Sequence, residues 1–427
     1  MTVRAGIVVT GTEVLSGIIR DENGPWLSER LRGLGVSLRD VIVVADRPDD
    51  LRAALDFLVA QQVDLIITTG GLGPTADDLT GEVVAAFAGR PLVLDPALEE
   101  RVWAIVSRLR ARFRDASEEG MRAGARKQAL VPEGAFVLEP VGTAPGLVVP
   151  GSPLVVVLPG PPGELQPMWE DALATPPVRD VLSRAGVLEQ RIMRVMGAPE
   201  SELARVLREV SFSLDPLEIT TCLRRGELEI ATVFDPAAAD TYASLEAAVV
   251  ERFGERVFSR DGATIDEIVA ALLLGPPVST VAVAESCTGG LMAGRLTDRA
   301  GSSAYVLGGV VVYSNEAKVA HAGVPMELIE RVGAVSPEVA AALASGAAAR
   351  FGADIGIGIT GIAGPGGGTP EKPVGMVCVC VAGPGGAVLE RTLQLPGDRA
   401  AVRDRTTTAV MHLLRRALLA GGTAAAA

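Results

Sequence analysis

Histidine and cysteine are both scarce in this chain of 427 residues, which contains two histidines and four cysteines. Two histidines exclude a His-rich metal cage and disfavour catalysis that needs a histidine pair. The cysteines include no C-x-x-C pair, and a chain of this length needs no disulfide staples. We therefore expect a protein of the reducing cytoplasm.

Positively charged residues are also outnumbered: the chain has 39 lysines and arginines and 52 aspartates and glutamates, which gives a net charge of −13. Such a chain repels nucleic acids and anionic membranes unless a local patch overrides the average. The long uncharged stretches 140–163 and 268–284 are interrupted by prolines, so neither can form a continuous membrane helix. We expect no nucleic-acid partner and no membrane partner.

Apolar runs alternate with amphipathic segments in two parts of the chain. In the first part, runs at 3–10, 36–44 and 64–69 predict strands, and the segments between them predict helices. A second pattern of this kind begins at Thr264. Strands that alternate with helices favour a parallel sheet covered on both faces.

The segment between these parts differs in composition: its charged residues are denser, and residues 218–234 show the pattern of a β-hairpin. The sequence thus predicts an α/β protein. Two three-layer α/β domains with mainly parallel sheets are joined by a small α+β linker domain. The predicted domains are 1–171, 172–260 and 261–420, followed by a flexible tail at 421–427.

The first candidate site is the glycine-rich turn GGLGPTADDLT at 70–80, which follows a predicted strand and opens a helix. Glycines let the backbone approach a ligand closely, and a helix start offers N–H groups to an anion. The candidate phosphate-binding residues are Gly70, Gly71, Gly73 and Thr75. Four carboxylates at the same sheet edge are candidate ligands of a divalent cation: Glu13, Asp46, Asp77 and Asp78. The alternative is a tight turn whose aspartates only cap the helix.

The second candidate site begins at Ser286, which stands at a predicted strand-to-helix turn in AESCTGG. The N–H groups of Thr288, Gly289 and Gly290 are predicted to face a developing oxyanion. A serine nucleophile needs a base, and a desolvated, neutral Lys318 in YSNEAK is the candidate.

Tyr313, from the same YSNEAK segment, is placed to relay or orient the proton. Ordinary roles are the alternative for all three: a helix cap for Ser286, a solvated lysine, and a core aromatic. Cys287 is a rival nucleophile, although a lone cysteine beside glycines more often serves packing.

Further candidates follow in the same part of the chain. A second glycine-rich stretch starts with Thr360 and Gly361, and Arg399 follows in the segment PGDR. An arginine can hold a phosphate through two parallel hydrogen bonds. The alternative for each is a loop or a surface charge.

The motifs GTEVLSG at 11–17, KQA at 127–129, PVGTAPG at 140–146 and LPGPPGE at 158–164, with the glycine-rich turn, resemble the N-terminal domain of the CinA family. That domain is similar to molybdopterin-binding proteins of the MoaB/MogA type. The resemblance implies an ADP-ribose pyrophosphatase that uses Mg, Mn or Co and releases AMP and ribose 5-phosphate. One departure is Arg126, because family members often have Asn before KQA.

Residues 264–419 resemble the CinA C-terminal domain, whose stand-alone form, PncC, is a nicotinamide mononucleotide deamidase. AESCTGG, YSNEAK, GAVS, TGIAGP, EKPVG and PGDR are all present in order. The resemblance implies Ser286 as the nucleophile with Lys318 and Tyr313 as proton-transfer partners. It also implies that Gly361 and Arg399 bind the nucleotide, and it implies no cofactor in this domain.

The middle segment of CinA relatives resembles a KH-type fold. Here it lacks the G-x-x-G loop that clamps RNA, so we expect a structural role, with Arg224 and Arg225 solvated at the hairpin tip. The family resemblance also suggests a homodimer.

Several functions are therefore in competition. The first is a bifunctional enzyme that deamidates nicotinamide mononucleotide (NMN) and cleaves ADP-ribose. The others are a deamidase with a binding-only N-terminal domain, a non-enzymatic competence or damage-inducible scaffold, and molybdopterin handling by the first domain.

Overall fold

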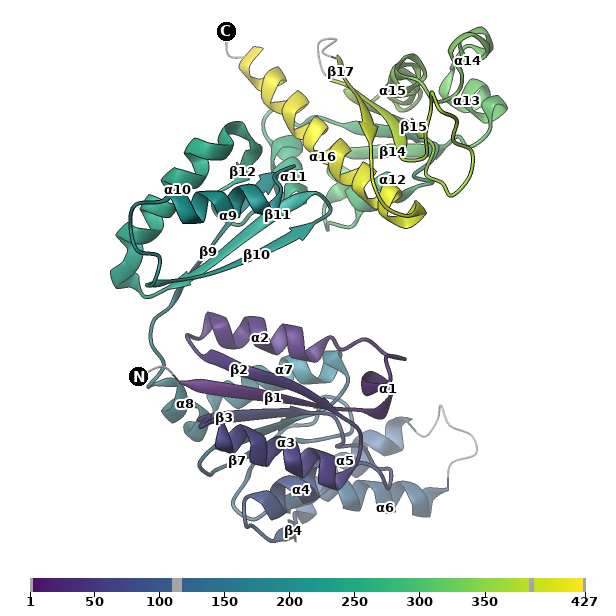
Figure 1. The fold of residues 1–427 in the computed structure, drawn as a ribbon. Coiled ribbons are helices and arrows are strands. Elements are labelled where there is room, and N and C mark those ends of the chain that lie inside the picture. The colour runs from purple at the N-terminus through teal and green to yellow at the C-terminus, as the bar shows by residue number, and fades with distance from the viewer. Residues whose placement is uncertain (1–2, 110–116, 384–387, 425–427) are drawn as a thin grey trace. The chain divides into compact units, whose positions relative to one another are not determined.

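The computed structural model describes residues 3–109, 117–383 and 388–424 (Figure 1). It forms two compact units, one of residues 1–190 with 234–238 and the other of 191–233 with the chain from 239 onward. The sequence predicted the end of the first domain at residue 171. The first unit extends further because Val178 and Val181 of helix α8 pack into its core. No helix in the described ranges is long and apolar enough to cross a membrane.

The first unit is built on a six-stranded sheet with the order β2-β1-β3-β8-β7-β6. The first four strands are parallel, as predicted, and the last two are antiparallel. The strand bounds are β1 Arg4–Thr10, β2 Ser37–Val44, β3 Leu65–Thr69, β6 Phe136–Leu138, β7 Gly146–Val149 and β8 Leu154–Leu158.

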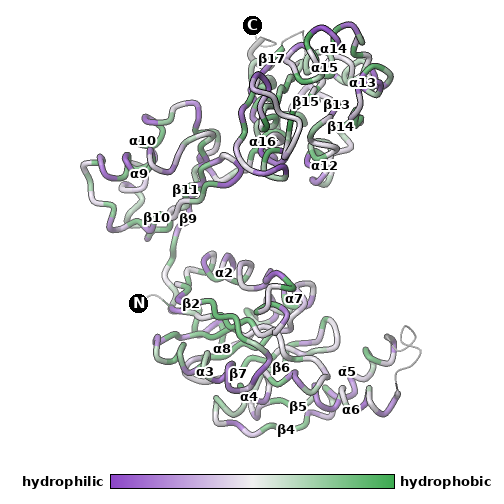
Figure 2. Tube along the Cα trace, turned by 45° about the vertical axis from the view of Figure 1, so that its right-hand side comes forward, coloured by the Kyte–Doolittle hydropathy of each residue, from purple (hydrophilic) through white to green (hydrophobic). Residues whose placement is uncertain are grey.

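Helices cover both faces of this sheet because its central strands carry apolar side chains on both sides. Ile7 and Ile67 belong to the hydrophobic core on one face, while Val8 and Ile66 belong to the core on the other. Hydrophobic stretches accordingly run through the middle of this unit in Figure 2. One face carries α2 (Asn23–Gly33), α7 (Pro162–Ala174) and α8 (Pro176–Leu182); the other carries α3 (Pro48–Ala60), α4 (Thr80–Phe87), α5 (Pro96–Leu109) and α6 (Glu118–Gln128).

The smaller elements of this unit differ from expectation in one respect. From residue 96 the sequence predicts a helix at about 96–113 and then two short strands before Pro159. In this stretch the described residues form four strands, β5 to β8, and β5 (Leu130–Pro132) pairs with β4 (Leu92–Leu94) in a separate two-stranded sheet. Helix α1 is a single turn, Thr12–Leu15. The predicted end of the helix 96–113 lies outside the described residues.

The second unit begins with a four-stranded sheet of order β10-β11-β9-β12. The predicted hairpin is confirmed: Arg225 and Gly226 both have positive φ and join its two strands, as a primed turn requires. The bounds are β9 Glu189–Met196, α9 Glu200–Glu209, β10 Leu217–Arg224, β11 Glu227–Phe234, α10 Ala239–Phe253 and β12 Val257–Ser259.

The hairpin contacts the C-terminal helix α16 (Arg399–Ala424). Arg225, expected to be solvated, forms an ion pair with Asp404 at 2.9 Å. His412 lies 2.6 Å from Glu227, and both side chains are mostly buried. The middle segment and the C-terminal segment therefore share one unit.

The rest of this unit is a five-stranded sheet of order β14-β13-β15-β16-β17. Its first three strands are parallel, whereas β16 pairs antiparallel with both β15 and β17. The α/β class is confirmed. The strands are β13 Val281–Glu285, β14 Val306–Val311, β15 Ile355–Gly361, β16 Met376–Ala382 and β17 Val388–Gln394.

Helices again pack on both faces. Thr264 followed by Glu267 three residues later is the sequence pattern of a capping box, and Ser336-Pro337 is that of a helix start. The structure confirms both predictions: Thr264 and Glu267 form the capping box, and Ser336 caps its helix. Helix α16 continues to Ala424, so part of the predicted tail is helical, and residues 425–427 lie outside the described ranges. The remaining helices are α11 Ile265–Leu274, α12 Leu291–Thr297, α13 Asn315–Ala322, α14 Met326–Val332 and α15 Pro337–Phe351.

Candidate active sites

Ser286 lies at the turn between strand β13 and helix α12, at the end of three parallel strands. Its backbone N–H donates to the carbonyl of Ile359 in β15 at 3.0 Å, which fixes the turn against the neighbouring strand. The residue is 8% exposed, so its hydroxyl sits at the edge of the interior. We call residues 286–290, which connect the strand to the helix, the nucleophile loop.

Lys318 is the group that the structure brings to Ser286. Ser314 caps helix α13 by accepting from the N–H of Ala317, and this places Lys318 one turn into the helix. The lysine is 2% exposed, and its Nζ lies 3.3 Å from Ser286 Oγ. Burial lowers the pKa of Lys318. A fraction of this lysine is therefore neutral at a pH where an exposed lysine stays charged.

Backbone carbonyl oxygens surround Lys318 Nζ. Nζ donates to the carbonyl oxygens of Val312 at 3.1 Å and Tyr313 at 3.3 Å, and a third carbonyl oxygen, that of Ser314, lies 3.5 Å away. A neutral amine has two N–H bonds and one lone pair. In the neutral form the two shorter bonds use both N–H groups, and the lone pair is left for the hydroxyl proton of Ser286.

The hydroxyl of Tyr313 lies elsewhere. The side chain is 60% exposed, and its oxygen accepts from Arg399 Nη2 at 2.7 Å. Among the described residues it has no hydrogen bond to Ser286 or Lys318. Arg399 also donates through Nη1 to the carbonyl of Gly364 at 2.8 Å. The structure thus forms a Ser286–Lys318 pair and, separately, a Tyr313–Arg399 pair.

The predicted oxyanion donors are occupied. The N–H of Gly289 donates to the carbonyl of Ser286, and the N–H of Gly290 donates to the carboxylate of Glu285. The backbone N–H of Thr288 has no oxygen acceptor among the described residues, but it hydrogen-bonds the side chain of Cys287, and Thr288 is fully buried. The structure therefore leaves none of these three predicted N–H donors free.

Glu285 is a residue that sequence reasoning missed. Its side chain is fully buried, and its carboxylate accepts from the N–H groups of Gly290, Met292 and Ala293 at 2.8–3.1 Å. The carboxylate thus caps the start of helix α12 from the preceding strand. The available signal was a glutamate between a wholly apolar strand and a glycine-rich helix start.

Other predicted residues of this site have structural contacts. Thr360 is buried and donates to the carbonyl of Ala334 at 2.7 Å. A Cβ on Gly361 would lie 2.8 Å from Val377 Cγ2, so only glycine fits there without a shift. Burial raises the pKa of Cys287 to about 11, which keeps this thiol protonated at neutral pH and unsuited as a nucleophile.

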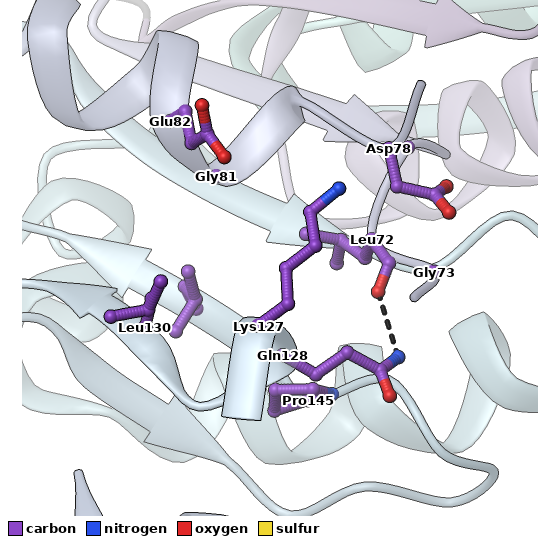
Figure 3. Close-up of a pocket in the computed structure, with 11 residues that line it drawn as sticks. Leu72, Gly73, Asp78, Gly81, Glu82, Lys127, Gln128, Leu130 and Pro145 are labelled. Carbon is purple, nitrogen blue, oxygen red and sulfur yellow. Dashed lines mark hydrogen bonds between the residues drawn. The ribbon is translucent and has the colours of Figure 1, made fainter. Parts of the chain in front are cut away.

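The first candidate site contains a small cavity of about 40 Å³ in the first unit. Gly71, Gly73 and Asp78 line it from the glycine-rich turn, and Lys127 and Gln128 reach it from helix α6 (Figure 3). Gln128 donates to the carbonyl of Leu72 at 2.9 Å, and Lys127 donates to the carbonyl of Thr75. The KQA segment is thereby tied to the glycine-rich turn.

The backbone of the glycine-rich turn requires a glycine at position 70. Gly70 has a φ of +100°, and a Cβ there would lie 2.3 Å from the carbonyl oxygen of Thr10. Thr75 was predicted to donate to phosphate. Its hydroxyl lies 2.5 Å from a carboxylate oxygen of both Asp77 and Asp78, so its one proton already has acceptors. The hydrogen bond from Thr75 holds the pKa of Asp77 below its usual value.

The four candidate metal ligands do not form one cluster. Asp46 and Asp77 line the same small cavity, while Asp78 lines the other. Asp46 accepts from the N–H and hydroxyl of Thr12, and Glu13 is exposed on α1. In the described part of the chain, no three acidic, His or Cys side chains gather as a metal-binding group. The metal site stays a prediction.

Arg126, the departure from the family pattern, points to a neighbouring helix. Its Nη1 lies 3.5 Å from Glu99 of α5, and the residue does not line the cavity of its neighbours Lys127 and Gln128. The substitution therefore lies beside the cavity and outside its lining.

Comparison with known proteins supports the division seen in the sequence. Residues 6–180 match the model of a family described as a probable molybdopterin binding domain, and residues 263–418 match the CinA C-terminal domain. A CinA-like protein of Mycolicibacterium gilvum is 59% identical over 425 residues, which cover 99% of this chain and all of the relative. The chain belongs to the CinA family.

Other CinA family members agree. A CinA-like protein of Mycobacterium tuberculosis is 54% identical over 424 residues, or 98% of each chain. A solved structure of a competence/damage inducible protein from Agrobacterium tumefaciens is 41% identical. It covers 36% of this chain and 91% of its own, with a TM-score of 0.33. Family membership rests on the full-length relatives. The name CinA-like specifies no reaction, so the chemistry of the sites carries the functional argument.

Proposed function

We propose that the C-terminal domain of this CinA family member is an amidohydrolase that converts NMN and water to nicotinate mononucleotide and ammonia. The observation that carries the proposal is the buried Lys318, whose Nζ lies 3.3 Å from the hydroxyl of Ser286. A buried amine within reach of a serine hydroxyl supplies the base that the nucleophile needs.

The reaction follows in two halves. Neutral Lys318 takes the hydroxyl proton of Ser286 while Oγ bonds to the amide carbon of the substrate. The tetrahedral oxyanion collapses, the C–N bond breaks, and the proton on Lys318 passes to the leaving nitrogen, which departs as ammonia. Water then attacks the ester carbon while Lys318 takes a proton from it. The bond between that carbon and Ser286 Oγ breaks, Lys318 returns the proton to Oγ, and the acid product leaves and ionises in solvent to the carboxylate.

Arg399 is the proposed phosphate anchor of NMN. Its side chain is exposed, and it presents five N–H donors, of which two meet Gly364 and Tyr313. The remaining N–H donors and the positive charge of the guanidinium are left to bind an anion. In this arrangement Tyr313 orients Arg399, and its part in proton transfer stays a prediction.

Ammonia release from NMN tests the proposal. We expect turnover by the unmodified protein and a loss of several orders of magnitude in kcat for both Ser286→Ala and Lys318→Ala. Ser303→Ala removes an exposed serine of the same domain and serves as the matched control. Absence of turnover by the unmodified protein, or full activity of Ser286→Ala, would contradict the proposal.

A second activity is proposed for the first unit, namely cleavage of ADP-ribose to AMP and ribose 5-phosphate. The favouring observation is that the ammonium of Lys127 meets the glycine-rich turn beside Asp78 (Figure 3). The cavity has room for only a few waters, so the ligand must bind across its mouth or widen it.

A divalent ion would fit this site only in part. Asp46 and Asp77 supply two carboxylates, but from the other small cavity, which Lys127 does not line, and the described residues supply no third. Mg²⁺ is often held by one or two carboxylates together with substrate phosphates, so an ion that arrives with the pyrophosphate suits this set. The ion would neutralise phosphate charge when bound.

AMP release in the presence of Mg²⁺, Mn²⁺ or Co²⁺, measured against an EDTA control, tests this second proposal. Lys127→Ala is expected to lower the rate, while Arg126→Asn, which alters a side chain outside the cavity, should change it less than about threefold. Release of no AMP with any of the ions would favour a binding-only first domain.

A further inference from the structure

The hairpin strand β10 (Leu217–Arg224) forms an open edge of the four-stranded sheet. The strand order is β10-β11-β9-β12, so among the described residues only β11 pairs with β10. Residues 220–224 are exposed at every position, and Leu223 keeps 50% of its accessible surface. An exposed edge strand offers a row of unpaired N–H and C=O groups to another chain.

The strand lacks the features that commonly protect such an edge. Residues 219–223, ITTCL, contain no charge and no proline, although lysines and prolines within an edge strand are the usual protection. The opposite edge of the sheet is β12, Val257–Ser259, which is only three residues long. One edge of this sheet is therefore suited to pairing with another chain, and the other is not.

The turn of the hairpin determines which backbone groups of β10 face outward. Only residues 225 and 226 separate β10 from β11, so Arg224 and Glu227 face each other beside the turn. In a hairpin closed by two residues these flanking residues form a hydrogen-bonded pair, and such pairs then alternate along the strand. Even-numbered residues of β10 thus bond to β11, and odd-numbered residues present their N–H and C=O groups to the open edge.

Two copies of the chain can join their β10 strands only in registers that twofold symmetry allows. In a continuous antiparallel sheet the twofold axis is perpendicular to the sheet, and two facing residues point to the same side of it. The numbers of two facing residues must therefore have an even sum. With Thr221 on the axis, the outward-facing odd-numbered residues of one copy meet those of the other.

The side chains of β10 are complementary to themselves in this register. Glu218 of each copy faces Arg224 of the other, and Ile219 faces Leu223, so each pair occurs twice. Glu218 and Arg224 have no ion-pair partner within the described part of their own chain. Opposite charges and apolar side chains that face each other across antiparallel strands stabilise the pairing.

The neighbouring registers lose this match. With Thr220 on the axis, Glu218 faces Cys222. With Cys222 on the axis, Arg224 faces Thr220. The sequence of the strand therefore selects both its partner, a second copy, and the register of the pairing.

We propose that the protein forms a twofold-symmetric dimer in which two β10 strands pair antiparallel about Thr221, so that two four-stranded sheets become one sheet of eight. The assembly closes at two copies, because each copy uses the one long open edge of this sheet. A contact over residues 218–224 is small beside the roughly 20–30 residues per partner of a standard interface, so we expect a reversible dimer. The proposal does not depend on the proposed amidohydrolase activity.

Disulfide trapping tests the register. Facing residues at hydrogen-bonded positions have Cα atoms about 5.5 Å apart, which is within disulfide range. In Thr221→Cys, made in a Cys222→Ser background, the two new thiols face each other on the axis. Oxidation by copper phenanthroline in air should therefore give a covalent dimer on a non-reducing gel.

The matched control for trapping is the unmodified protein. Its Cys222 is exposed and lies one position off the axis, and its other three cysteines are buried. The two copies of Cys222 would lie diagonally, about 7–8 Å apart, which is beyond easy disulfide reach. Cross-linking of the unmodified protein should therefore be much slower.

Sedimentation velocity tests the pairing itself. Glu218→Arg places like charges face to face twice and should raise the Kd of the dimer about tenfold, and adding Arg224→Glu should restore it. Thr221→Lys places two ammonium groups together on the axis and should leave a monomer where the unmodified protein is a dimer. Ala243→Lys adds the same charge at an exposed position of α10, a helix that contacts β12, and should remain dimeric.

Four results would overturn the inference. The first is an unmodified protein that stays monomeric at tens of micromolar. The second is a dimer that survives Thr221→Lys, which would mean that another surface joins the copies. The third is equal cross-linking of Thr221→Cys and the unmodified protein, and the fourth is no recovery in the variant with both charges exchanged. Ammonia release from NMN is measured separately, so failure of the proposed function would leave this test unaffected.

Discussion

The buried carboxylate of Glu285 gives the sharpest stability prediction. It accepts three backbone N–H groups at the start of helix α12. The bond from Met292 is buried, whereas those from Gly290 and Ala293 are partly buried and can be replaced by water. In Glu285→Ala one N–H is therefore left without a partner, which costs about 1–3 kcal/mol. The lost helix cap costs about 0.5–2 kcal/mol more.

The expected loss in the free energy of unfolding is thus about 1.5–5 kcal/mol for Glu285→Ala. Glu285→Gln keeps one acceptor oxygen but loses the charge, so about 1–2 kcal/mol is expected. The loss should be confined to the second unit, because α12 packs its Met292 and Leu296 into the core of that unit.

The native cysteines and tryptophans of the chain can report on the unfolding of each unit. All four cysteines lie in the second unit, and three of them, Cys287, Cys378 and Cys380, are buried. All three tryptophans lie in the first unit. Thiol labelling along a urea series therefore follows the second unit, while tryptophan fluorescence follows the first.

We expect the Glu285 variants to move the thiol-labelling midpoint to lower urea and to leave the fluorescence midpoint in place. Glu327→Ala removes an exposed glutamate from the first turn of α14 and should change stability by less than about 0.5 kcal/mol. The reasoning would be refuted by an unmoved labelling midpoint in Glu285→Ala, or by an equal shift of both midpoints.

Three further predictions concern single groups. Because burial lowers the pKa of Lys318, kcat/KM for deamidation should rise with pH through a midpoint below 10.5, the ordinary value; a pH–rate profile with a midpoint at or above that value would oppose the assignment. Cys287→Ala should keep kcat within about threefold, since the thiol is protonated at neutral pH; a loss of 10²-fold in an ammonia assay would revive the cysteine as nucleophile. Gly70→Ala should destabilise the first unit by about 1–3 kcal/mol, because its φ of +100° and the carbonyl of Thr10 leave no room for a Cβ; an unshifted fluorescence midpoint in urea would contradict this.

Local and periodic features of the fold could be predicted from the sequence. The capping box of Thr264, the cap at Ser336 and the hairpin turn at Arg225 depend on residues within a few positions of each other. Strands buried on both faces leave uninterrupted apolar runs, so β1 and β3 were also accessible. The extra strand β5 was not, because a three-residue strand has no measurable period.

The candidate sites were accessible only where a motif marks them. The approach of Lys318 to Ser286 was predicted from two motifs that follow neighbouring strands. The hydrogen bond from Arg403 to the nucleophile loop joins residues more than a hundred positions apart in the sequence, and no local pattern predicts such a contact. The hydrogen bond between Tyr313 and Arg399 also joins residues far apart in the sequence, so no local pattern predicts it either. Whether Asp46, Asp77 and Asp78 share an ion depends on side-chain directions that strand order does not determine.

The most direct test of the central claim is to trap the acyl group that Ser286 is proposed to carry. The protein is incubated with NMN and hydroxylamine, and the hydroxamate of nicotinate mononucleotide is measured by mass spectrometry beside a sample without protein. If an ester forms on Ser286, hydroxylamine competes with water for it, so hydroxamate should appear with the unmodified protein and be lost in Ser286→Ala and Lys318→Ala. Ammonia release without any hydroxamate, or equal hydroxamate formation by Ser286→Ala, would contradict the account.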